Sequence, residues 1–291
     1  SKKDAISFAW KKILGRAPSV DELTTALDHY NQQVTHFKDV NDQAMQVRGR
    51  SPAVDKVPSS GLHFWVSADA GKTTDSNGKL LLWKDLSGNG HDVTQADSGR
   101  RPIYVGKAIG NKPAMRFSGK REFLKIKGQV IKGQEFTFFA VASDRSSSEE
   151  HREIISNWNG RAGNSTNSLF LGLTGKSTVR FSDDFSSKDK VIGAPGHGFL
   201  LSASSGRLGS QINFNGQTLA TRSSSLKERR MDTEWVIGQQ GNIEGEYWQG
   251  DIAELLVYER QLEPQEMESI SKLLAKKYDL TMNYSLRKKP V

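Results

Sequence analysis

Apolar residues follow helical spacing at the beginning of the chain. Ala5, Phe8 and Ala9 keep the spacing of one helical face, and Gly15 is a residue type that commonly ends helices. The pattern predicts a first short helix that stops at Gly15.

A second helix is predicted to begin at Ser19. Ser19 and Glu22 have the spacing of a capping box, in which each side chain satisfies a backbone amide of the other residue. The apolar face of this helix consists of Leu23, Leu27, Tyr30, Val34 and Phe37. Residues 1–47 therefore predict a helical hairpin, which is too small to bury its apolar face alone and must pack on something else.

From Gly61 the spacing of apolar residues changes from helical to alternating. Residues 48–60 form a proline-containing linker, and short β-type runs separated by Gly, Asn, Asp and Ser clusters follow it. The predicted strands are Leu62–Val66, Leu80–Trp83, Ile103–Val105, Ala114–Phe117, Phe123–Ile126, Phe136–Ala142, Glu153–Trp158, Leu169–Leu173, Thr178–Phe181, Phe199–Ala203, Gln211–Phe214, Thr218–Thr221, Glu234–Ile237 and Asp251–Tyr258. Their spacing predicts a mainly β domain, a two-sheet antiparallel jelly-roll sandwich over residues 61–280.

The last predicted strand, Asp251–Tyr258, is apolar on both faces. A strand buried on both sides needs cover beyond the opposite sheet. The amphipathic segment 263–278, with Pro264 in its first turn, predicts a helix that supplies this cover, and the N-terminal hairpin is a second candidate. Residues 281–291 form a basic tail.

Composition narrows the class of protein. The 291 residues include 27 glycines, which favours a turn-rich β fold, and no cysteine, which excludes disulfides and thiolate metal sites. The formal charge of +8 is compatible with simple solubility or with a polyanionic partner such as a sulfated or uronic-acid polysaccharide. No basic run is typical of a nucleic-acid arm, and no apolar run is long enough to span a membrane.

Three motifs follow one another within the predicted sandwich. They are Trp83-Lys84-Asp85-Leu86-Ser87-Gly88-Asn89-Gly90, Lys112-Pro113-Ala114-Met115-Arg116-Phe117-Ser118-Gly119 and Gly250-Asp251-Ile252-Ala253-Glu254-Leu255-Leu256-Val257-Tyr258-Glu259-Arg260-Gln261-Leu262. In this order they resemble the signatures of bacterial laminin-G-like jelly rolls. That resemblance implies a concanavalin A-like fold and a carbohydrate-binding, lectin-like function.

The N-terminal hairpin carries a separate resemblance. The segment Phe8-Ala9-Trp10-Lys11-Lys12-Ile13-Leu14-Gly15-Arg16-Ala17-Pro18-Ser19 is similar to the end of an uncharacterised domain of large exported proteins from Planctomycetes and Verrucomicrobia. This resemblance implies a piece of a larger protein with sibling domains as partners. It also implies a periplasmic, cell-surface or secreted location, although no signal peptide is present.

Carbohydrate binding requires an aromatic platform beside planar polar groups. The polar segment 157–164 offers one aromatic side chain, and two later segments add further candidates. The predicted carbohydrate-binding residues are Trp158, Asn159, Arg161, Asn164, Arg180, Asp183 and Tyr247. The alternative is that Trp158 caps the core while the polar residues form turns.

Two further acidic features have competing interpretations. Asp183 and Asp184 are an adjacent pair in a strand-end loop, and they are the predicted ligands of a calcium ion that this kind of sandwich can bind. Glu254 lies among apolar residues, which favours a structural carboxylate that binds backbone or an arginine such as Arg116.

No catalytic residue is predicted. The acidic motif of jelly-roll glucanases, glutamate-x-aspartate-x-(x)-glutamate, is missing from the sequence. The segment Gln211-Ile212-Asn213 lacks the histidine of the corresponding strand in jelly-roll lyases. The acidic cluster Glu149-Glu150-His151-Arg152-Glu153 follows a serine-rich stretch and is interpreted as a loop. The six histidines show no metal-ligand spacing.

The sequence therefore predicts a non-catalytic carbohydrate-binding module for a polysaccharide. A structural or protein-interaction sandwich without a glycan ligand is the alternative, and a glycoside hydrolase or lyase is the less favoured one.

Overall fold

The computed structural model describes residues 2–32, 56–147, 149–158, 168–191, 195–241 and 243–283. The chain divides into two compact units, Ser1–Ala53 and Val54–Val291. Each unit is described by itself.

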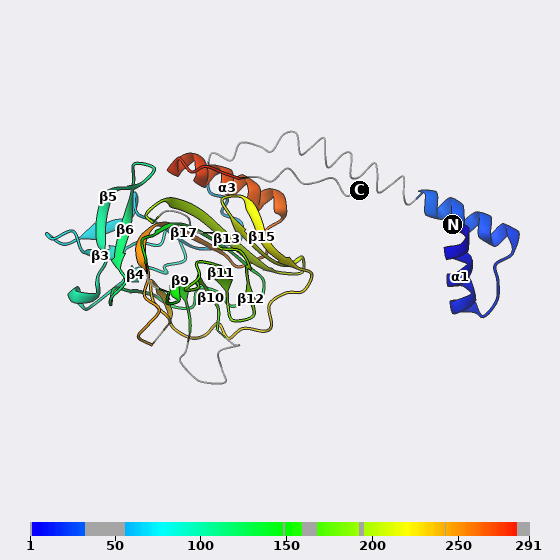
Figure 1. Cartoon of the computed structure of the whole chain (residues 1–291), viewed down its shortest axis with the longest axis horizontal. Coiled ribbons are helices and arrows are strands. Elements are labelled where there is room, and N and C mark those ends of the chain that lie inside the picture. Colours follow the sequence, from blue (N-terminus) through cyan, green and yellow to red (C-terminus); the bar gives the residue numbers. More distant parts are fainter. Residues whose placement is uncertain are drawn as a thin grey trace. The chain divides into compact units, whose positions relative to one another are not determined.

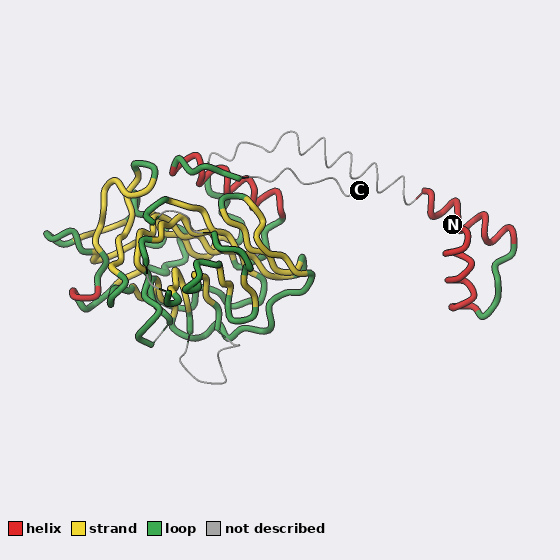
Figure 2. Tube along the Cα trace, in the orientation of Figure 1, coloured by secondary structure: helices red, strands yellow, loops and turns green. Residues whose placement is uncertain are grey.

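The described part of the first unit consists of two helices (Figures 1 and 2). Helix α1 spans Lys2–Leu14, and Gly15 ends it with a positive φ of 70°. The second helix covers residues 20–32, and its remaining predicted residues lie outside the described ranges. The capping box is confirmed, since Ser19 N donates to Glu22 Oε2 (2.7 Å) and Glu22 N donates to Ser19 Oγ (3.2 Å).

The second unit contains two antiparallel sheets, which confirms the predicted sandwich (Figures 1 and 2). The eight-stranded sheet has the order β15-β14-β13-β8-β17-β6-β5, with β1 also paired to β17. Its strands are β1 (Leu62–Ser67), β5 (Ile103–Ile109), β6 (Lys112–Ser118), β8 (Phe136–Asp144), β13 (Gly198–Gly206), β14 (Gly209–Phe214), β15 (Gln217–Arg222) and β17 (Gln249–Tyr258).

The nine-stranded sheet has the order β12-β11-β10-β9-β16-β7-β4-β3-β2. Its strands are β2 (Lys72–Thr74), β3 (Leu80–Trp83), β4 (Val93–Thr94), β7 (Leu124–Ile126), β9 (Arg152–Ser156), β10 (Phe170–Leu173), β11 (Val179–Phe181), β12 (Phe185–Ser186) and β16 (Trp235–Ile237). A short 3-10 helix, η1, spans Ser98–Arg100. The sequence pattern missed β2, β4 and β12, because each of them has two or three residues and at most one apolar side chain.

The main core lies between the two sheets. It contains large side chains that are fully buried, including Trp83, Phe138, Phe181 and Trp235. Since successive side chains in a strand point to opposite faces, each sheet also has an outer face. The two outer faces differ in what covers them.

Helix α3 (Pro264–Tyr278) covers the outer face of the eight-stranded sheet, as predicted (Figure 1). Its apolar stripe includes Met267, Ile270 and Leu274, which pack with strand residues such as Phe139 and Leu256 in a second buried cluster. This cover explains why β17 is apolar on both faces. Among the described helices, α3 included, none combines the length and the hydropathy that a membrane crossing requires.

Two carboxylates of β17 are buried with specific partners. Glu254 lies beneath α3, where it accepts hydrogen bonds from Trp65 Nε1 (2.7 Å), Lys277 Nζ (2.6 Å) and Tyr278 Oη (2.8 Å). The predicted structural role of Glu254 agrees with these contacts, but Arg116, the arginine named as an example, is not its partner. The register places Arg116 opposite Asp251 instead, and two hydrogen bonds of 2.6 and 2.9 Å join them.

Candidate functional site

The outer face of the nine-stranded sheet presents a polar cluster centred on Arg180. Leu171 and Phe181 point into the core, so Gly172 and Arg180, which face each other across β10 and β11, point outward. The Arg180 guanidinium lies 4.6 Å above the centre of the Phe170 ring, within the range of a cation–π contact. Arg180 thus stands on an aromatic platform on the face that α3 does not cover.

Two carboxylates bind the same nitrogen of Arg180. Glu153 comes from β9 and Glu246 from the segment before β17, and each forms an ion pair with Arg180 Nη2. The two acidic residues are also joined through the backbone, because Glu153 N donates to Glu246 O (2.9 Å). This arrangement brings together three charged groups that are far apart in the sequence.

Glu153 is fully buried, and burial raises the pKa of its carboxyl to about 7 against the opposing effect of Arg180. Its atom Oε2 has no hydrogen-bond partner among the described residues. A carboxyl group with this pKa can donate or accept a proton near neutral pH. With Glu153 ionised, the group of Glu153, Glu246 and Arg180 carries one net negative charge, and with Glu153 protonated it carries none.

Trp158 contacts the same aromatic platform. Its ring lies 6.1 Å from the Phe170 ring in an edge-on arrangement, and its backbone N donates to Ser156 Oγ (3.1 Å). The indole Nε1 is buried and has no partner within the part of the chain that the structure describes, as is also true of Arg180 Nε. Of the predicted carbohydrate-binding residues, Trp158 and Arg180 are therefore brought together around Phe170.

Tyr247 and Asp183, the other predicted residues that the structure describes, take different partners. Tyr247 follows Glu246, but the charged groups that act on its hydroxyl are Glu244, Arg100 and Arg121 rather than Arg180. Asn159, Arg161 and Asn164 are outside the described residues.

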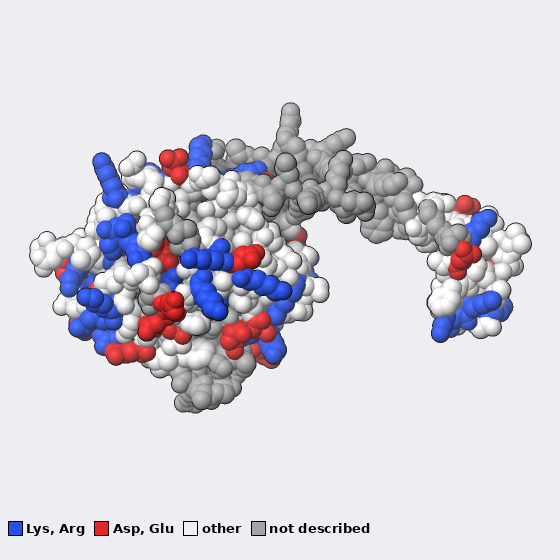
Figure 3. Space-filling view, in the orientation of Figure 1, with Lys and Arg blue, Asp and Glu red and all other residues white. Residues whose placement is uncertain are grey.

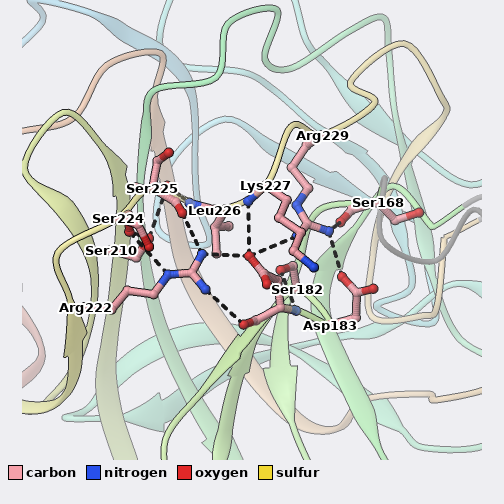
Figure 4. Close-up of polar contacts among 12 residues, drawn as sticks. Ser168, Ser182, Asp183, Ser210, Arg222, Ser224, Ser225, Leu226, Lys227 and Arg229 are labelled. Atoms are coloured by element: carbon pink, nitrogen blue, oxygen red, sulfur yellow. Dashed lines mark hydrogen bonds and ion pairs between the residues drawn. The ribbon is translucent and has the colours of Figure 1, made fainter.

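Asp183 and Asp184 both bind arginines at the strand ends, and Figure 4 shows Asp183 beside Arg229. Asp183 accepts from Arg229 Nη1 (2.6 Å), and Asp184 accepts from Arg222 Nη2 (2.6 Å) and from the backbone N of Lys227 (3.1 Å). The hydrogen bond from Arg222 lowers the pKa of Asp184 to about 2, although partial burial opposes this effect. Both carboxylates thus take guanidinium partners, and the described residues include no group of three or more His, Cys, Asp or Glu side chains that could hold a metal ion.

Glu153, Glu246, Phe170 and Gly172 were not identified from the sequence. The sequence predicts Glu153 both as the first residue of the strand Glu153–Trp158 and as the last residue of an acidic loop cluster, and the structure places it in β9. The sequence does hold one signal for Glu153, which directly precedes two isoleucines. An acidic residue in a buried strand needs a hydrogen-bond or charged partner.

No model of a protein family matches the sequence, and no curated protein matches it significantly. Solved structures do share the fold. A Trypanosoma rangeli sialidase in complex with 2,3-difluoro-KDN aligns with a TM-score of 0.54 and 15% identity, over 77% of this chain and 34% of the sialidase chain. Domain 4 of a GH43 extracellular arabinanase from Geobacillus stearothermophilus, in complex with arabinotriose, aligns with a TM-score of 0.52 and 12% identity, over 72% of this chain and 98% of that domain.

These neighbours overturn the expectation that the chain is not an enzyme. Sialidases depart from the two-carboxylate pattern of most glycoside hydrolases, so the missing acidic motif does not exclude a hydrolase of this kind. The chain spans about a third of the sialidases that it matches, and at this identity the likeness shows the fold. The neighbours are carbohydrate-active proteins with β-sandwich domains, which is compatible with a glycan-related role for this chain.

Proposed function

We propose that the sandwich binds a glycan at the outer face of the nine-stranded sheet, around Trp158, Phe170 and Arg180. The observation that carries the proposal is the set of three buried polar atoms without a partner among the described residues, namely Trp158 Nε1, Arg180 Nε and Glu153 Oε2. Buried polar atoms are normally hydrogen-bonded, and these three belong to residues grouped around the partly exposed Arg180 side chain. Each of the three atoms is closed to solvent, so within this proposal a ligand hydroxyl reaches them only after a local rearrangement. The glycans in complex with the structural neighbours agree with this class of ligand.

The charge of the cluster favours a neutral sugar. Arg180 already faces the carboxylates of Glu153 and Glu246, so an anionic sugar would have to displace one of them. Hydroxyl groups can instead donate to the carboxylates and accept from the guanidinium without such a displacement. The sequence-based suggestion of a sulfated or uronic-acid polysaccharide is therefore the less favoured ligand within this proposal.

Glycoside hydrolysis is a second candidate activity. Glu153, with a pKa of about 7, is a carboxyl group suited to proton transfer, and Glu246 supplies a second carboxylate on the same guanidinium. The proposal further includes the laminin-G-like family, an exported location and sibling domains, all of which rest on the sequence resemblances.

A glycan array with the whole chain tests binding, followed by calorimetry with arabinotriose and with sialyllactose. We expect retention of a neutral glycan and a loss of about tenfold or more in affinity for Trp158→Ala. Trp10→Ala in the N-terminal hairpin is the matched control and keeps wild-type affinity. Trp158→Phe, which preserves the packing on Phe170, separates lost binding from lost folding.

Two outcomes would redirect the proposal. If no glycan binds and Trp158→Ala changes nothing, the structural or protein-interaction role replaces it. Release of reducing sugar or free sialic acid from the same panel, abolished in Glu153→Gln, would support hydrolysis.

A further inference from the structure

One row of outward-facing residues crosses the nine-stranded sheet. The pairing register places Phe170 opposite Ser156, Ser156 opposite Val236, Val236 opposite Lys125 and Lys125 opposite Thr94. The first three of these residues are buried, whereas Lys125 and Thr94 are exposed. The face that carries the Arg180 cluster is therefore open to solvent farther along the same row.

A groove of about 480 Å³ lies on this open part of the face. Thr94, Lys125 and Gln129 line it from the side of the sheet and the segment after β7, and Asp232 and Glu234 line it from the segment before β16. Its volume is within the usual range for small-ligand sites.

The groups in the groove suit sugar hydroxyls. Lys125 pairs with Glu234 (3.1 Å) and Asp232 pairs with Arg230 (2.8 Å), so these opposite charges compensate one another, while Lys127 adds a further cation to the lining. The hydroxyl of Thr94 and the amide of Gln129 add donors and acceptors without charge. Figure 3 shows basic and acidic side chains interspersed on the face of the sandwich in view, without a broad patch of one sign.

One hydrogen bond links the wall of the groove to the segment that precedes Trp158. Thr233 in its wall donates a hydrogen bond to the carbonyl oxygen of Asn157 (2.6 Å), the residue before Trp158. Three strand spacings separate Phe170 from Lys125 along the row, which corresponds to about 14 Å. This separation is too large for one sugar ring and suits a chain of several.

We propose that this groove binds further sugar units of the same glycan, so that the ligand is a neutral oligosaccharide segment rather than a monosaccharide. This inference rests on the proposed glycan binding at Trp158 and Arg180, and it adds a second subsite to it.

Calorimetry with two length series tests the groove, arabinose to arabinohexaose and glucose to maltohexaose. In the wild-type chain we expect affinity to rise by about tenfold or more between the monosaccharide and the longer oligosaccharides of one series. The double variant Lys125→Ala/Glu234→Ala removes two half-exposed side chains of opposite charge, so the net charge of the chain is kept. We expect this variant to lose the gain in affinity with oligosaccharide length and to retain the affinity for the monosaccharide. The matched control is Lys272→Ala/Glu268→Ala, an exposed ion pair on α3, which should behave as wild type.

The outcomes separate the two proposals. If a neutral sugar binds but length gives no gain, or if the Lys125 and Glu234 variant keeps the gain, the groove is not a subsite and the Arg180 site stands alone. If only acidic oligosaccharides bind, the neutral ligand is wrong. If no glycan of the array or of the two series binds, the proposed function itself fails.

Discussion

The carboxylate of Glu153 occupies the space directly above Gly172, where any other residue would place its Cβ. The two residues are paired across β9 and β10, and a Cβ at Gly172 would overlap Glu153 Oε2 and the carbonyl oxygen of Arg152. The missing side chain on β10 thus lets a buried acid of β9 lie beside Arg180. Glu153 can therefore take this position only because its neighbour on the next strand, Gly172, has no side chain.

Replacing Gly172 by alanine should destabilise the sandwich by about 1–3 kcal/mol, because overpacking at a buried position forces neighbours to shift. Urea unfolding of Gly172→Ala and the wild type measures the difference. Gly106→Ala is the control, since a Cβ there would meet no atom within 4 Å. Equal stability of the two variants would show that Glu153 can move away without cost.

The Glu153 carboxyl should make the sandwich less stable as pH rises. Its pKa is about 7 in the folded chain and 4.5 ordinarily, so between these values the unfolded chain loses a proton that the folded chain keeps. The free energy of unfolding should therefore fall from about pH 4.5 to 7, by on the order of 3 kcal/mol from this group. Glu153→Gln stays neutral and should remove this part of the decline in urea titrations across pH 4.5–8.

The comparison between variant and wild type isolates this effect from other titrating groups. Arg180 binds the carboxyl and also pairs with Glu246, and His151 lies within electrostatic reach of Arg180; all three residues are unchanged in the variant. Exposed Glu268→Gln should follow the wild-type curve. Parallel curves for Glu153→Gln and the wild type would mean that Glu153 is ionised in the folded chain at neutral pH.

Much of the fold could be predicted from the sequence because its signals are local. The capping box at Ser19 and Glu22 and the helix that begins at Pro264 are short patterns with direct physical causes. The Asn-Gly pair at Asn215 and Gly216, between the predicted strands Gln211–Phe214 and Thr218–Thr221, is another local signal, because it is typical of a tight hairpin turn and both residues adopt the positive φ that such a turn requires. The apolar faces of β17 likewise revealed a helix packed on the sheet.

The site was less accessible to sequence reasoning because its parts come from separate strands. Trp158 and Arg180 were identified by residue type, but nothing in the sequence places Glu153 and Glu246 on one guanidinium. That contact depends on strand order and on the bulge between Leu171 and Gly172, neither of which leaves a local pattern. The partner of Arg116 could not be predicted for the same reason. The strand register places Arg116 opposite Asp251, and no local sequence pattern reveals that register.

Calcium at Asp183 and Asp184 is open to a direct measurement. A cation there would have to displace the guanidinium groups of Arg229 and Arg222, which bind the two carboxylates. We therefore expect calcium chloride or a chelator to leave the melting temperature unchanged within error. A rise in melting temperature with calcium that disappears in Asp183→Asn/Asp184→Asn would support the predicted metal site instead.

Asp184 should stabilise the fold most above pH 4. The pKa of its carboxyl is lowered from 3.8 to about 2, so its contribution is present above the ordinary value and is lost as pH falls toward 2. Asp184→Asn should be less stable than the wild type at pH 6 and should approach it at pH 2 in thermal unfolding. Asp232→Asn, which removes an exposed partner of Arg230, is the control and should have little effect at either pH.

Removal of the Glu254 carboxylate should be among the most damaging single changes in the sandwich. Glu254 is 1% exposed and binds three side chains at 2.6–2.8 Å, one of them the ammonium of Lys277. Glu254→Ala leaves the Trp65 indole N–H and the Tyr278 hydroxyl without their buried acceptor, whereas Lys277 keeps Asp69 at 3.2 Å, so the expected loss is about 2–4 kcal/mol. Glu268→Ala, on the exposed side of α3, should change stability little. Because Tyr278 and Lys277 belong to α3, the Glu254 variant should also detach the helix, and faster amide exchange along α3 than along β8 would report it. A loss no larger than that of Glu268→Ala would mean that apolar packing alone holds α3 on the sheet.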